Sequence, residues 1–526
     1  MRVVTSILVI LYLFSPAHSF AQNSLFSKVY YGLSNWTQGY SMLKVADGYM
    51  IAGTLDGSPM VMKTGNAGEI EWINRDSALV SGMYSSLTNG REGTIWVGGI
   101  AYDASLGGND LILRNLTYSG IVLTSKRYHF PLSVFVYSIE VTVDKGLIIS
   151  GAETYPVGSP IMMFVMKTDS SGNIQWLRTM YSPEESCCAH SVRPVSGGGY
   201  ILTADIIVYN PQVLKCGLLV KLDDSGGITW SKRLSDIPFG DTYAYDAVEC
   251  SGGYLLLMAG KWRNLMTIPV DTNGIPSTGW KYNIFPTPGM TYEVPFPKLR
   301  KCHDNGYIFV SGGEGWWDAV VKTDSTGNLQ WSSDLILKTF DVAESDDHGY
   351  AVLGNGPVWG WMQGYTMNPQ IGMVEMDSTG YAYSCYKQGT EVPDTASVSA
   401  ADFTLIVSFM RAEVTELPSW TTAGLSADEG CVSFTGDNNL TSPEKCKLVV
   451  SPNPAEDYVH VEVCPELSCH ARTLEIYDHV GRIIYSGQTN ILRPTLVDCS
   501  RFPQGVYYVR VATENEPMSS KVMIIR

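Results

Sequence analysis

Five tryptophans fall in three short segments whose composition suits ligand binding. The segments are AGKWRNLM (259–266), SGGEGWWDAV (311–320) and GNGPVWGWMQGYT (354–366), and they also contain Arg263, Glu314 and Gln363. Flat aromatic faces beside hydrogen-bonding groups suit sugar rings or apolar polymer segments. Side chains that fold inward to pack these segments are the alternative. The predicted ligand-binding residues are Trp262, Trp316, Trp317, Trp359, Trp361 and Asp318.

Other reactive side chains form no recognisable catalytic or metal motif. Cys187-Cys188-x-His190 offers two adjacent thiols and one imidazole, which do not make a closed metal site. His129, His303 and His348 are isolated in the sequence, and a role in loops or in structure is expected for them and for His190. No G-x-S-x-G, H-E-x-x-H or P-loop motif is present. The sequence therefore predicts no catalytic residue, no metal site and no cofactor.

A repeated framework surrounds these residues. The phrase AVVKTDSTGNLQW at 319–331 recurs as FVMKTDSSGNIQW at 164–176, with drifted copies elsewhere. Asp and Ser accept or donate hydrogen bonds in turns and Gly takes positive φ, so the phrase predicts a β-hairpin. A calcium loop is the alternative for its Asp, but it lacks the several carboxylates that calcium prefers. The tryptophans that end the hairpins recur at a period close to fifty: Trp72, Trp176, Trp230, Trp280 and Trp331.

A second repeated phrase precedes each hairpin. Gly-bounded apolar runs such as DNGYIFVSGG (304) and DDHGYAVLGN (346) occur eight times and predict strands buried on both faces. About four short strands in each fifty residues predict a β-propeller over residues 22–434, with eight blades, or seven as the alternative. We expect the five tryptophans that end the hairpins to occupy equivalent, largely buried places between blades. The N-terminal strand around 26–31 should close the ring.

The hairpin phrase resembles motifs of two enzyme families. Asp324 to Trp331 resembles the docking motif of quinoprotein dehydrogenase propellers, which is structural there and carries no cofactor residues. The Ser-x-Asp-x-Gly-x-Thr-Trp repeat of sialidases is less similar, because the interval from Asp to Gly differs. The phrases also resemble repeats in secreted Bacteroidetes proteins. These resemblances imply an architecture and no activity.

Composition and the N-terminus place the chain outside the cytoplasm. Residues 1–21 have one Arg, an apolar stretch too short to span a membrane and small residues before Ala21, as in a secretory signal peptide. A net charge of −16 argues against a nucleic-acid partner. The 11 cysteines suggest disulfides, with Cys464–Cys469 and Cys431–Cys446 near enough for local bridges. No transmembrane segment is expected in the mature chain.

The last 80 residues carry four ordered motifs. They are Ser451-Pro452-Asn453-Pro454-Ala455, Tyr477-Asp-x-x-Gly481-Arg, Phe502-x-x-Gly505-Val-Tyr507-Tyr and a C-terminal KVMIIR. Together they resemble the type A C-terminal sorting domain of the type IX secretion system of Bacteroidetes, over residues 447–526. This resemblance implies a small Ig-like β-sandwich, passage through an outer-membrane translocon, and release or attachment at the cell surface. Residues 435–446 are the expected linker.

The sequence thus predicts an all-β protein exported to the cell surface or the medium. The favoured function is a binding or adhesion module for glycans or proteins, with the type IX machinery as the export partner. A secreted glycan hydrolase whose carboxylates converge from several blades is one alternative. A passive structural component of an extracellular complex is the other.

Overall fold

A computed structural model describes most of residues 25–429 and 448–524, in two compact units, 1–434 and 435–526. The described residues exclude these gaps: 32–36, 77–78, 80, 92, 104–106, 155–159, 184, 209–213, 237–241, 261–264, 283–296, 313–317, 336, 357–369, 383–385, 389–392, 411, 417–420, 423–425, 452–457, 464–471, 479–481, 490–494 and 512–517. The predicted signal peptide and linker lie outside the described residues.

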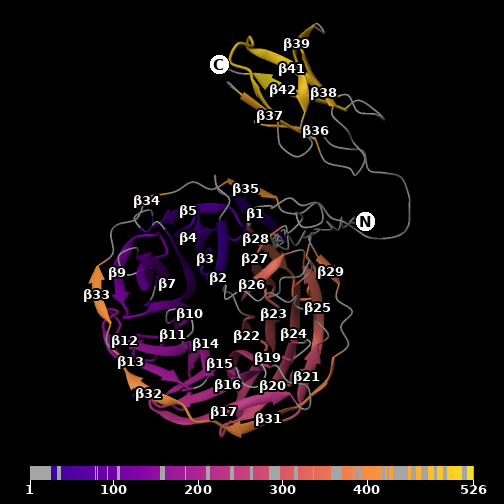
Figure 1. Ribbon diagram of the computed structural model, residues 1–526. Coiled ribbons are helices and arrows are strands. Elements are labelled where there is room, and N and C mark those ends of the chain that lie inside the picture. Colours follow the sequence, from indigo (N-terminus) through magenta and orange to yellow (C-terminus); the bar gives the residue numbers. More distant parts are fainter. Residues whose placement is uncertain are drawn as a thin grey trace, which may run out of the picture. The chain divides into compact units, whose positions relative to one another are not determined.

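The described part of the first unit forms seven five-stranded antiparallel sheets that stand as blades around a common centre (Figure 1). Successive blades use successive stretches of chain, and each begins with its innermost strand. Blade one has β2 (Thr37–Val45), β3 (Gly48–Leu55), β4 (Ser58–Thr64) and β5 (Ile70–Arg75); blade two has β6 (Gly82–Asn89), β7 (Thr94–Asp103), β8 (Gly108–Thr117) and β9 (Val122–His129); blade three has β10 (Ser133–Val141), β11 (Leu147–Thr154), β12 (Met162–Thr168) and β13 (Ile174–Tyr181).

Blades four to seven continue the same order. Blade four has β14 (Glu185–Pro194), β15 (Tyr200–Val208), β16 (Leu214–Leu222) and β17 (Ile228–Asp236); blade five has β18 (Tyr243–Cys250), β19 (Gly253–Ala259), β20 (Leu265–Asp271) and β21 (Gly279–Tyr282); blade six has β22 (Leu299–Lys301), β23 (Tyr307–Val310), β24 (Asp318–Thr323) and β25 (Leu329–Leu335); blade seven has β26 (Lys338–Glu344), β27 (Tyr350–Asn355) and β28 (Ile371–Met376). The all-β fold class predicted from the sequence is confirmed.

The N-terminal strand completes blade seven. β1 (Ser27–Tyr31) pairs antiparallel with β28, from Ser27 opposite Val374 to Tyr30 opposite Ile371. The prediction that this strand closes the ring is therefore confirmed. Because the first and last parts of the ring share one sheet, opening the ring requires breaking backbone hydrogen bonds.

The prediction of an eighth blade is wrong for the described residues, and the alternative of seven holds there. Residues 386–429, which we call the return segment, instead run back around the ring and add one outer strand to each blade (Figure 1). Unpaired edge strands expose backbone donors and acceptors, and the return segment covers these edges. In chain order it serves blades six, five, four, three, two, one and seven, with β29 (Tyr386–Gln388), β30 (Asp394–Ala396), β31 (Val398–Asp402), β32 (Ile406–Phe409), β33 (Glu413–Glu416), β34 (Thr421–Thr422) and β35 (Ser426–Glu429).

Four of the repeated tryptophans occupy equivalent positions, as predicted, each opposite a lysine of the preceding strand, as in Lys167 opposite Trp176 and Lys322 opposite Trp331. The prediction is wrong for Trp280, which lies opposite Thr267, two residues out of that register. The prediction that they are largely buried is wrong, because all five are half-buried. The indole N–H of each of four donates to a carbonyl in the next blade's hairpin, as Trp331 does to Ser378 at 3.0 Å. The other three are Trp72, Trp176 and Trp230.

A glycine in each receiving hairpin makes room for the ring. Gly380 has φ +82°, and a Cβ there would lie 2.5 Å from the indole of Trp331. Where a tyrosine takes part, its hydroxyl donates to the corresponding glycine carbonyl, as Tyr30 does to Gly68 at 2.6 Å and Tyr128 to Gly172 at 2.5 Å. All seven blade boundaries carry an aromatic contact of this kind.

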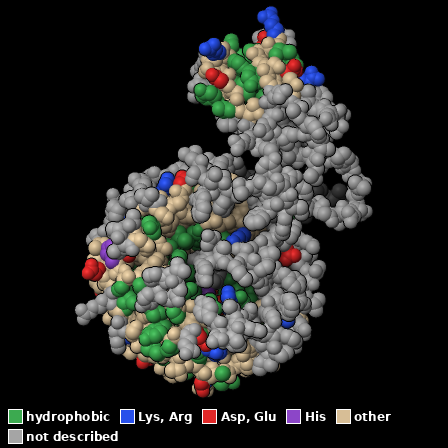
Figure 2. All heavy atoms as spheres, viewed as in Figure 1, with side chains coloured by type: hydrophobic (Ala, Val, Ile, Leu, Met, Phe, Trp, Pro, Cys, Tyr) green, Lys and Arg blue, Asp and Glu red, His purple; other side chains and the backbone are tan. Residues whose placement is uncertain are grey.

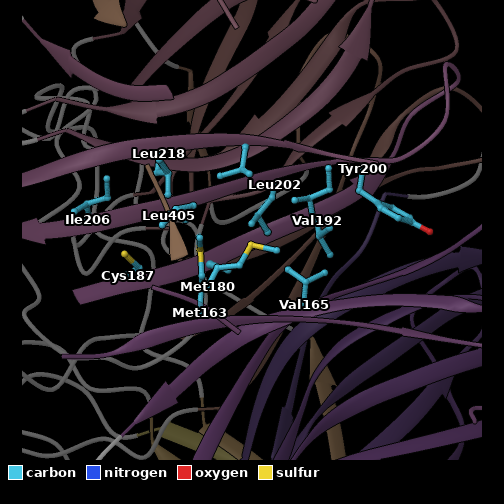
Figure 3. Close-up of a cluster of buried hydrophobic side chains, with 14 of the residues drawn as sticks. Met163, Val165, Met180, Cys187, Val192, Tyr200, Leu202, Ile206, Leu218 and Leu405 are labelled. Atoms are coloured by element: carbon cyan, nitrogen blue, oxygen red, sulfur yellow. The ribbon is translucent and has the colours of Figure 1, made fainter. Parts of the chain in front are cut away.

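Apolar side chains from neighbouring blades fill the space between their sheets. Figure 3 shows one such cluster, in which Met163, Val165 and Met180 of blade three meet Val192 and Leu202 of blade four. Leu405, from the return segment, joins the same cluster. Successive side chains of a strand point to opposite faces of its sheet, and in an inner strand both faces are buried against neighbouring blades. The sequence of such a strand is therefore continuously apolar.

The second unit contains two antiparallel sheets. One has β36 (Leu448–Ser451), β37 (Tyr458–Val463) and β40 (Thr495–Asp498); the other has β38 (Arg472–Tyr477), β39 (Ile483–Thr489), β41 (Gly505–Val511) and β42 (Met518–Ile524). Val461, Leu474 and Val509 belong to a core that both sheets share.

Candidate functional site

The five tryptophans of the predicted ligand patch lie outside the described residues, but the strands that flank them are described. These are the second and third strands of blades five, six and seven: β19 and β20, β23 and β24, and β27 and β28. Because strands in a blade alternate in direction, all second strands end on one side of the ring. We call this side the connection face, and the side of the hairpins that end in Trp the hairpin face.

Asp318 is the described member of that patch. It is the first residue of β24 and is buried, with 1% of its surface exposed. Its Oδ2 accepts hydrogen bonds from the backbone N–H of Thr339 at 2.7 Å and from the Thr339 hydroxyl at 3.1 Å. Asp318 therefore links blade six to blade seven.

Charged side chains of the innermost strands of blades three to seven form a belt at the centre of the ring. Arg193 on β14 donates to both oxygens of Asp246 on β18, at 3.0 and 2.8 Å, and lies 3.4 Å from Glu140 on β10. Arg300 on β22 donates to both oxygens of Asp341 on β26, at 2.9 and 3.0 Å. On the face drawn in Figure 2, Lys and Arg side chains lie near the centre of the ring.

The belt also joins strands through their backbones. The amide of Leu299 on β22 donates to Asp246 at 3.0 Å, and the amide of Met42 on β2 donates to Asp341 at 3.0 Å. In other blades a serine takes the acceptor's place, as Ser138 does for the amide of Val192 at 3.3 Å. Innermost strands of neighbouring blades share no ladder of backbone pairs, and these contacts supply the missing connections.

The belt brings three carboxylates together, yet the state of Asp246 does not suit catalysis. Burial alone would raise the pKa of Asp246, but the charge and hydrogen bonds of Arg193 outweigh it and hold that pKa well below its usual value. Asp246 and Asp341 have no exposed surface, and their oxygens accept hydrogen bonds from Arg193, Arg300 and backbone amides. A general acid must hold a proton near neutral pH and reach its substrate. Asp246 does neither.

Two other carboxyl groups keep their protons to higher pH. Burial raises the pKa of Glu153 and of Glu375 to about 7. Glu153 has no exposed surface and Glu375 has 5%, and both lie within sheets. One oxygen of Glu153 accepts from the Thr179 hydroxyl at 3.0 Å, and the other has no hydrogen-bond partner among the residues that the structure describes. These groups have suitable acidity but no access to a substrate, so they affect stability.

Aromatic side chains form an arc at bulges of the innermost strands. Bulges set an extra residue, such as Tyr40, Tyr137, His190, Tyr245 or Phe340, at equivalent positions in their strands. Rings meet across blade boundaries, with centroids 6.0 Å apart for Tyr40 and Phe340, 6.3 Å for Tyr137 and His190, and 6.0 Å for His190 and Tyr245. Bulges often re-aim side chains, and here they let neighbouring strands pack ring against ring.

The Cys187-Cys188-x-His190 segment is not assembled as a metal site. Cys187 points into the core between blades three and four, where Figure 3 shows it beside Met163 and Met180. Burial raises the pKa of Cys188 to about 12, so this thiol is neither a thiolate nucleophile nor a ready metal ligand. His190 pairs with Asp205, with 2.8 Å between Nε2 and Oδ2.

The aspartates of the repeated hairpins are turn formers, as predicted. Oδ1 of Asp324 accepts from the amides of Thr326 and Asn328 at 2.8 and 2.9 Å. The same pattern recurs at Asp169, Asp223, Asp271 and Asp377. The carboxylate oxygens are thus used within the turn.

One cluster was not predicted from the sequence. His303, in the turn between β22 and β23, contacts Glu344 and stacks on His348, in the turn between β26 and β27. The two histidines are 45 positions apart in the sequence, so no motif search joins them. The sequence feature that could have revealed the cluster is the occurrence of a histidine in the same turn of two consecutive repeats.

In the C-terminal unit, two of the predicted sorting residues are described. Gly505 begins β41, and the hydroxyl of Tyr507 donates to the carbonyl of Pro503 at 2.6 Å while its ring packs on Phe502. The motif Phe502-x-x-Gly505-Val-Tyr507 therefore fixes the entry into this strand. Pro452, Asn453, Pro454 and Gly481 lie outside the described residues.

Residues 449–526 match the family described as secretion system C-terminal sorting domain. The tail is therefore a type IX sorting domain. It indicates export by the type IX secretion system and a cell-surface or extracellular location. In the described part of the chain, no helix has the length and apolar character needed to cross a membrane.

Comparisons with whole proteins add little to this. No curated protein sequence matches the chain. One similar solved structure is a bifunctional GH43-CE protein of Bacteroides eggerthii, with 10% identity and a TM-score of 0.27 over 70% of this chain and 63% of the other. Another is dimeric latent PorU of Porphyromonas gingivalis, with 12% identity and a TM-score of 0.14 over 72% and 34%. The chain thus covers less than two thirds of either protein, and these scores support no functional argument.

Proposed function

We propose that this chain is a binding or adhesion protein of the type IX pathway, which presents a rigid propeller outside the cell. The sorting domain supplies the route of export. The propeller supplies a scaffold whose blades are linked to one another by the belt and the aromatic contacts. Processing near Gln22 and near residues 440–450, and an origin in Bacteroidetes, belong to the same proposal.

The observation that carries the binding role is the position of six strand ends. In blades five, six and seven, the second strand ends and the third begins at the connection face, and the segments between them contain Trp262, Trp316, Trp317, Trp359 and Trp361. The segment of blade seven, residues 356–370, is the longest of its kind, and blade one has only residues 56–57 there; residues 260–264 and 311–317 are no longer than residues 155–161 of blade three. Long connections on a rigid scaffold commonly carry binding residues. Indole rings suit glycans or apolar protein segments as ligands.

The hydrolase alternative is less well supported. It requires carboxylates that converge from several blades, and the convergent set of Glu140, Asp246 and Asp341 is held in ion pairs with Arg193 and Arg300. A passive structural role does not explain why the tryptophans are concentrated in these segments.

A glycan array probed with the purified chain without its predicted signal peptide, residues 22–526, tests the proposal. Binding to a defined glycan class, without release of cleaved products on prolonged incubation, is expected. Release of products would favour the hydrolase. Binding to neither glycans nor an extracellular-matrix protein panel would contradict a binding role and favour the passive structural one.

A further inference from the structure

The hairpin face carries three metal-binding side chains within reach of one ion. His303 lies in the turn after β22, Glu344 ends β26, and His348 lies in the turn after β26. Each offers one ligand atom, and these atoms all lie within 4.8 Å of one another. Nδ1 of His303 contacts Oε1 of Glu344, and the imidazole rings of His303 and His348 stack with centroids 3.8 Å apart.

Part of this arrangement is a contact that other blades also make. In blade four, the amide of Ser196 donates to Glu249 of blade five at 2.9 Å. In blade seven, Asp346 pairs with Lys44 of blade one at 2.8 Å. His303 and Glu344 repeat this contact between blades six and seven, so they alone would need no ligand to explain them. His348 is the addition, because the contact does not require it.

The turn that holds His348 does not require histidine either. His348 has φ +64°, and Asn305, at the equivalent position of the neighbouring blade, has φ +63°. Asparagine therefore fits this backbone conformation. A second imidazole stacked on the first, beside a carboxylate, brings together two nitrogen donors and one oxygen donor.

Two histidines and one carboxylate form a donor set that binds zinc with one coordination position left for water. Zinc bonds of about 2.0–2.2 Å place ligand atoms about 3–4 Å apart, so small side-chain rotations would close the site. His303 is 46% and Glu344 24% exposed at the side chain, which gives an ion access. The carboxylate of Asp347 lies near the imidazole of His348 and adds negative potential, whereas that of Asp304, near His303, pairs with Lys322 at 2.7 Å.

A second group of possible metal ligands, in blade two, differs because an arginine already neutralises its carboxylates. Asp103, Asp110 and His129 also lie close together in blade two. There the guanidinium of Arg127 donates to both carboxylates, at 2.9 and 2.7 Å, and occupies the place of a cation. No arginine or lysine bond to Glu344 is found among the described residues.

We propose that His303, Glu344 and His348 bind a divalent transition metal, Zn²⁺ in the first instance, and that the ion links blade six to blade seven. Because the ligands come from both blades, an ion that binds only the folded protein should also raise its thermal stability.

The test uses the chain without its predicted signal peptide, residues 22–526, stripped of metal and kept reduced, with Zn²⁺ as the probe. Zinc affinity is measured by competition with a chromophoric chelator, and the melting temperature is measured with and without zinc. His303→Ser installs the residue found at Ser196, and His348→Asn the residue found at Asn305, so both variants should fold. His129→Gln is the matched control, since it removes an imidazole outside the site.

We expect the wild type and His129→Gln to bind one zinc ion with equal affinity and to melt at a higher temperature when it is present. His303→Ser and His348→Asn should lose affinity by roughly tenfold or more, and zinc should no longer raise their melting temperature. Equal zinc binding by all four proteins would assign the ion to the cysteines or other groups and overturn the proposal. Absence of zinc binding by the wild type would overturn it as well.

Discussion

The hairpin face and the connection face of the propeller differ in how closely the blades repeat one another. On the hairpin face, Asp-based turns recur at Asp169, Asp223 and Asp324, and an aromatic ring contacts the next hairpin at every blade boundary. On the connection face, the segment between second and third strands ranges from residues 56–57 in blade one to residues 356–370 in blade seven.

This difference suggests how to separate structure from function in a repeat protein. Chemistry that recurs in every blade, such as the Trp and Gly contacts, maintains the ring. Chemistry confined to one or a few blades is not needed for the ring and is the better candidate for function. The five tryptophans in the sequence between the second and third strands of blades five to seven meet this criterion, and His348 meets it on the hairpin face.

The belt joins the innermost strands of neighbouring blades, so a substitution that breaks it should lower the free energy of unfolding more than the other substitutions below. Asp246→Ala leaves the guanidinium of Arg193 and the amide of Leu299 without their buried acceptor. We expect the free energy of unfolding to fall by about 3–5 kcal/mol, measured by urea denaturation. Asp346→Ala, which removes an ion pair whose carboxylate is 62% exposed, is the control and should cost less than about 1 kcal/mol. Similar costs for both variants would contradict the role assigned to the belt.

A smaller effect should come from Glu153, near the end of β11 that leads to the connection face. Its pKa is raised from 4.5 to about 7 by burial in the folded state. Folding therefore favours the protonated form, and stability should be fully present below about pH 4.5 and should fall as the pH rises through about 7. A difference of this size corresponds to up to about 3 kcal/mol. Glu153→Gln should make the profile flatter between pH 5 and 8, as measured by denaturation at each pH.

Glu375 gives a change of the same sign, so Glu153→Gln should remove only part of the slope and the double variant Glu153→Gln/Glu375→Gln should remove more. Glu413→Gln changes the net charge equally at an exposed position and should leave the slope unchanged. A pH profile that Glu153→Gln does not alter would show that water or another group compensates the carboxylate.

Much of the scaffold could be predicted from the sequence because local chemistry recurs. The Gly-bounded runs gave the second strands, the Asp and Gly turns gave the hairpins, and FSKVYYG gave the strand that closes the ring. The number of blades could not be predicted in the same way. The return segment has one short strand for each blade and no repeat of its own, so its apolar run at 401–409 resembled an eighth blade while β31 and β32 in fact join blades four and three.

The site was less predictable because its contacts join distant residues. Asp318 is next to Trp317 in the sequence, but its partner is Thr339 in the following blade. Arg193, Asp246 and Arg300 lie in different repeats, and nothing in their local sequence marks them as a belt. The partial burial of the repeated tryptophans could not be predicted for a related reason: their N–H groups donate to carbonyls in the hairpin of the next blade.

The most direct test of the account compares tryptophans assigned to the two faces in residues 22–526, with the glycan identified on the array as the ligand. Trp317→Ala/Trp359→Ala should lower the affinity at least roughly tenfold, the loss of one or more aromatic contacts, with an unchanged melting temperature. Trp331→Ala should do the reverse, keeping the affinity while losing about 2–3 kcal/mol of stability, because its half-buried indole holds the hairpin around Gly380. A double variant that binds normally, or that melts as early as Trp331→Ala, would contradict the assignment of the ligand site to the connection face.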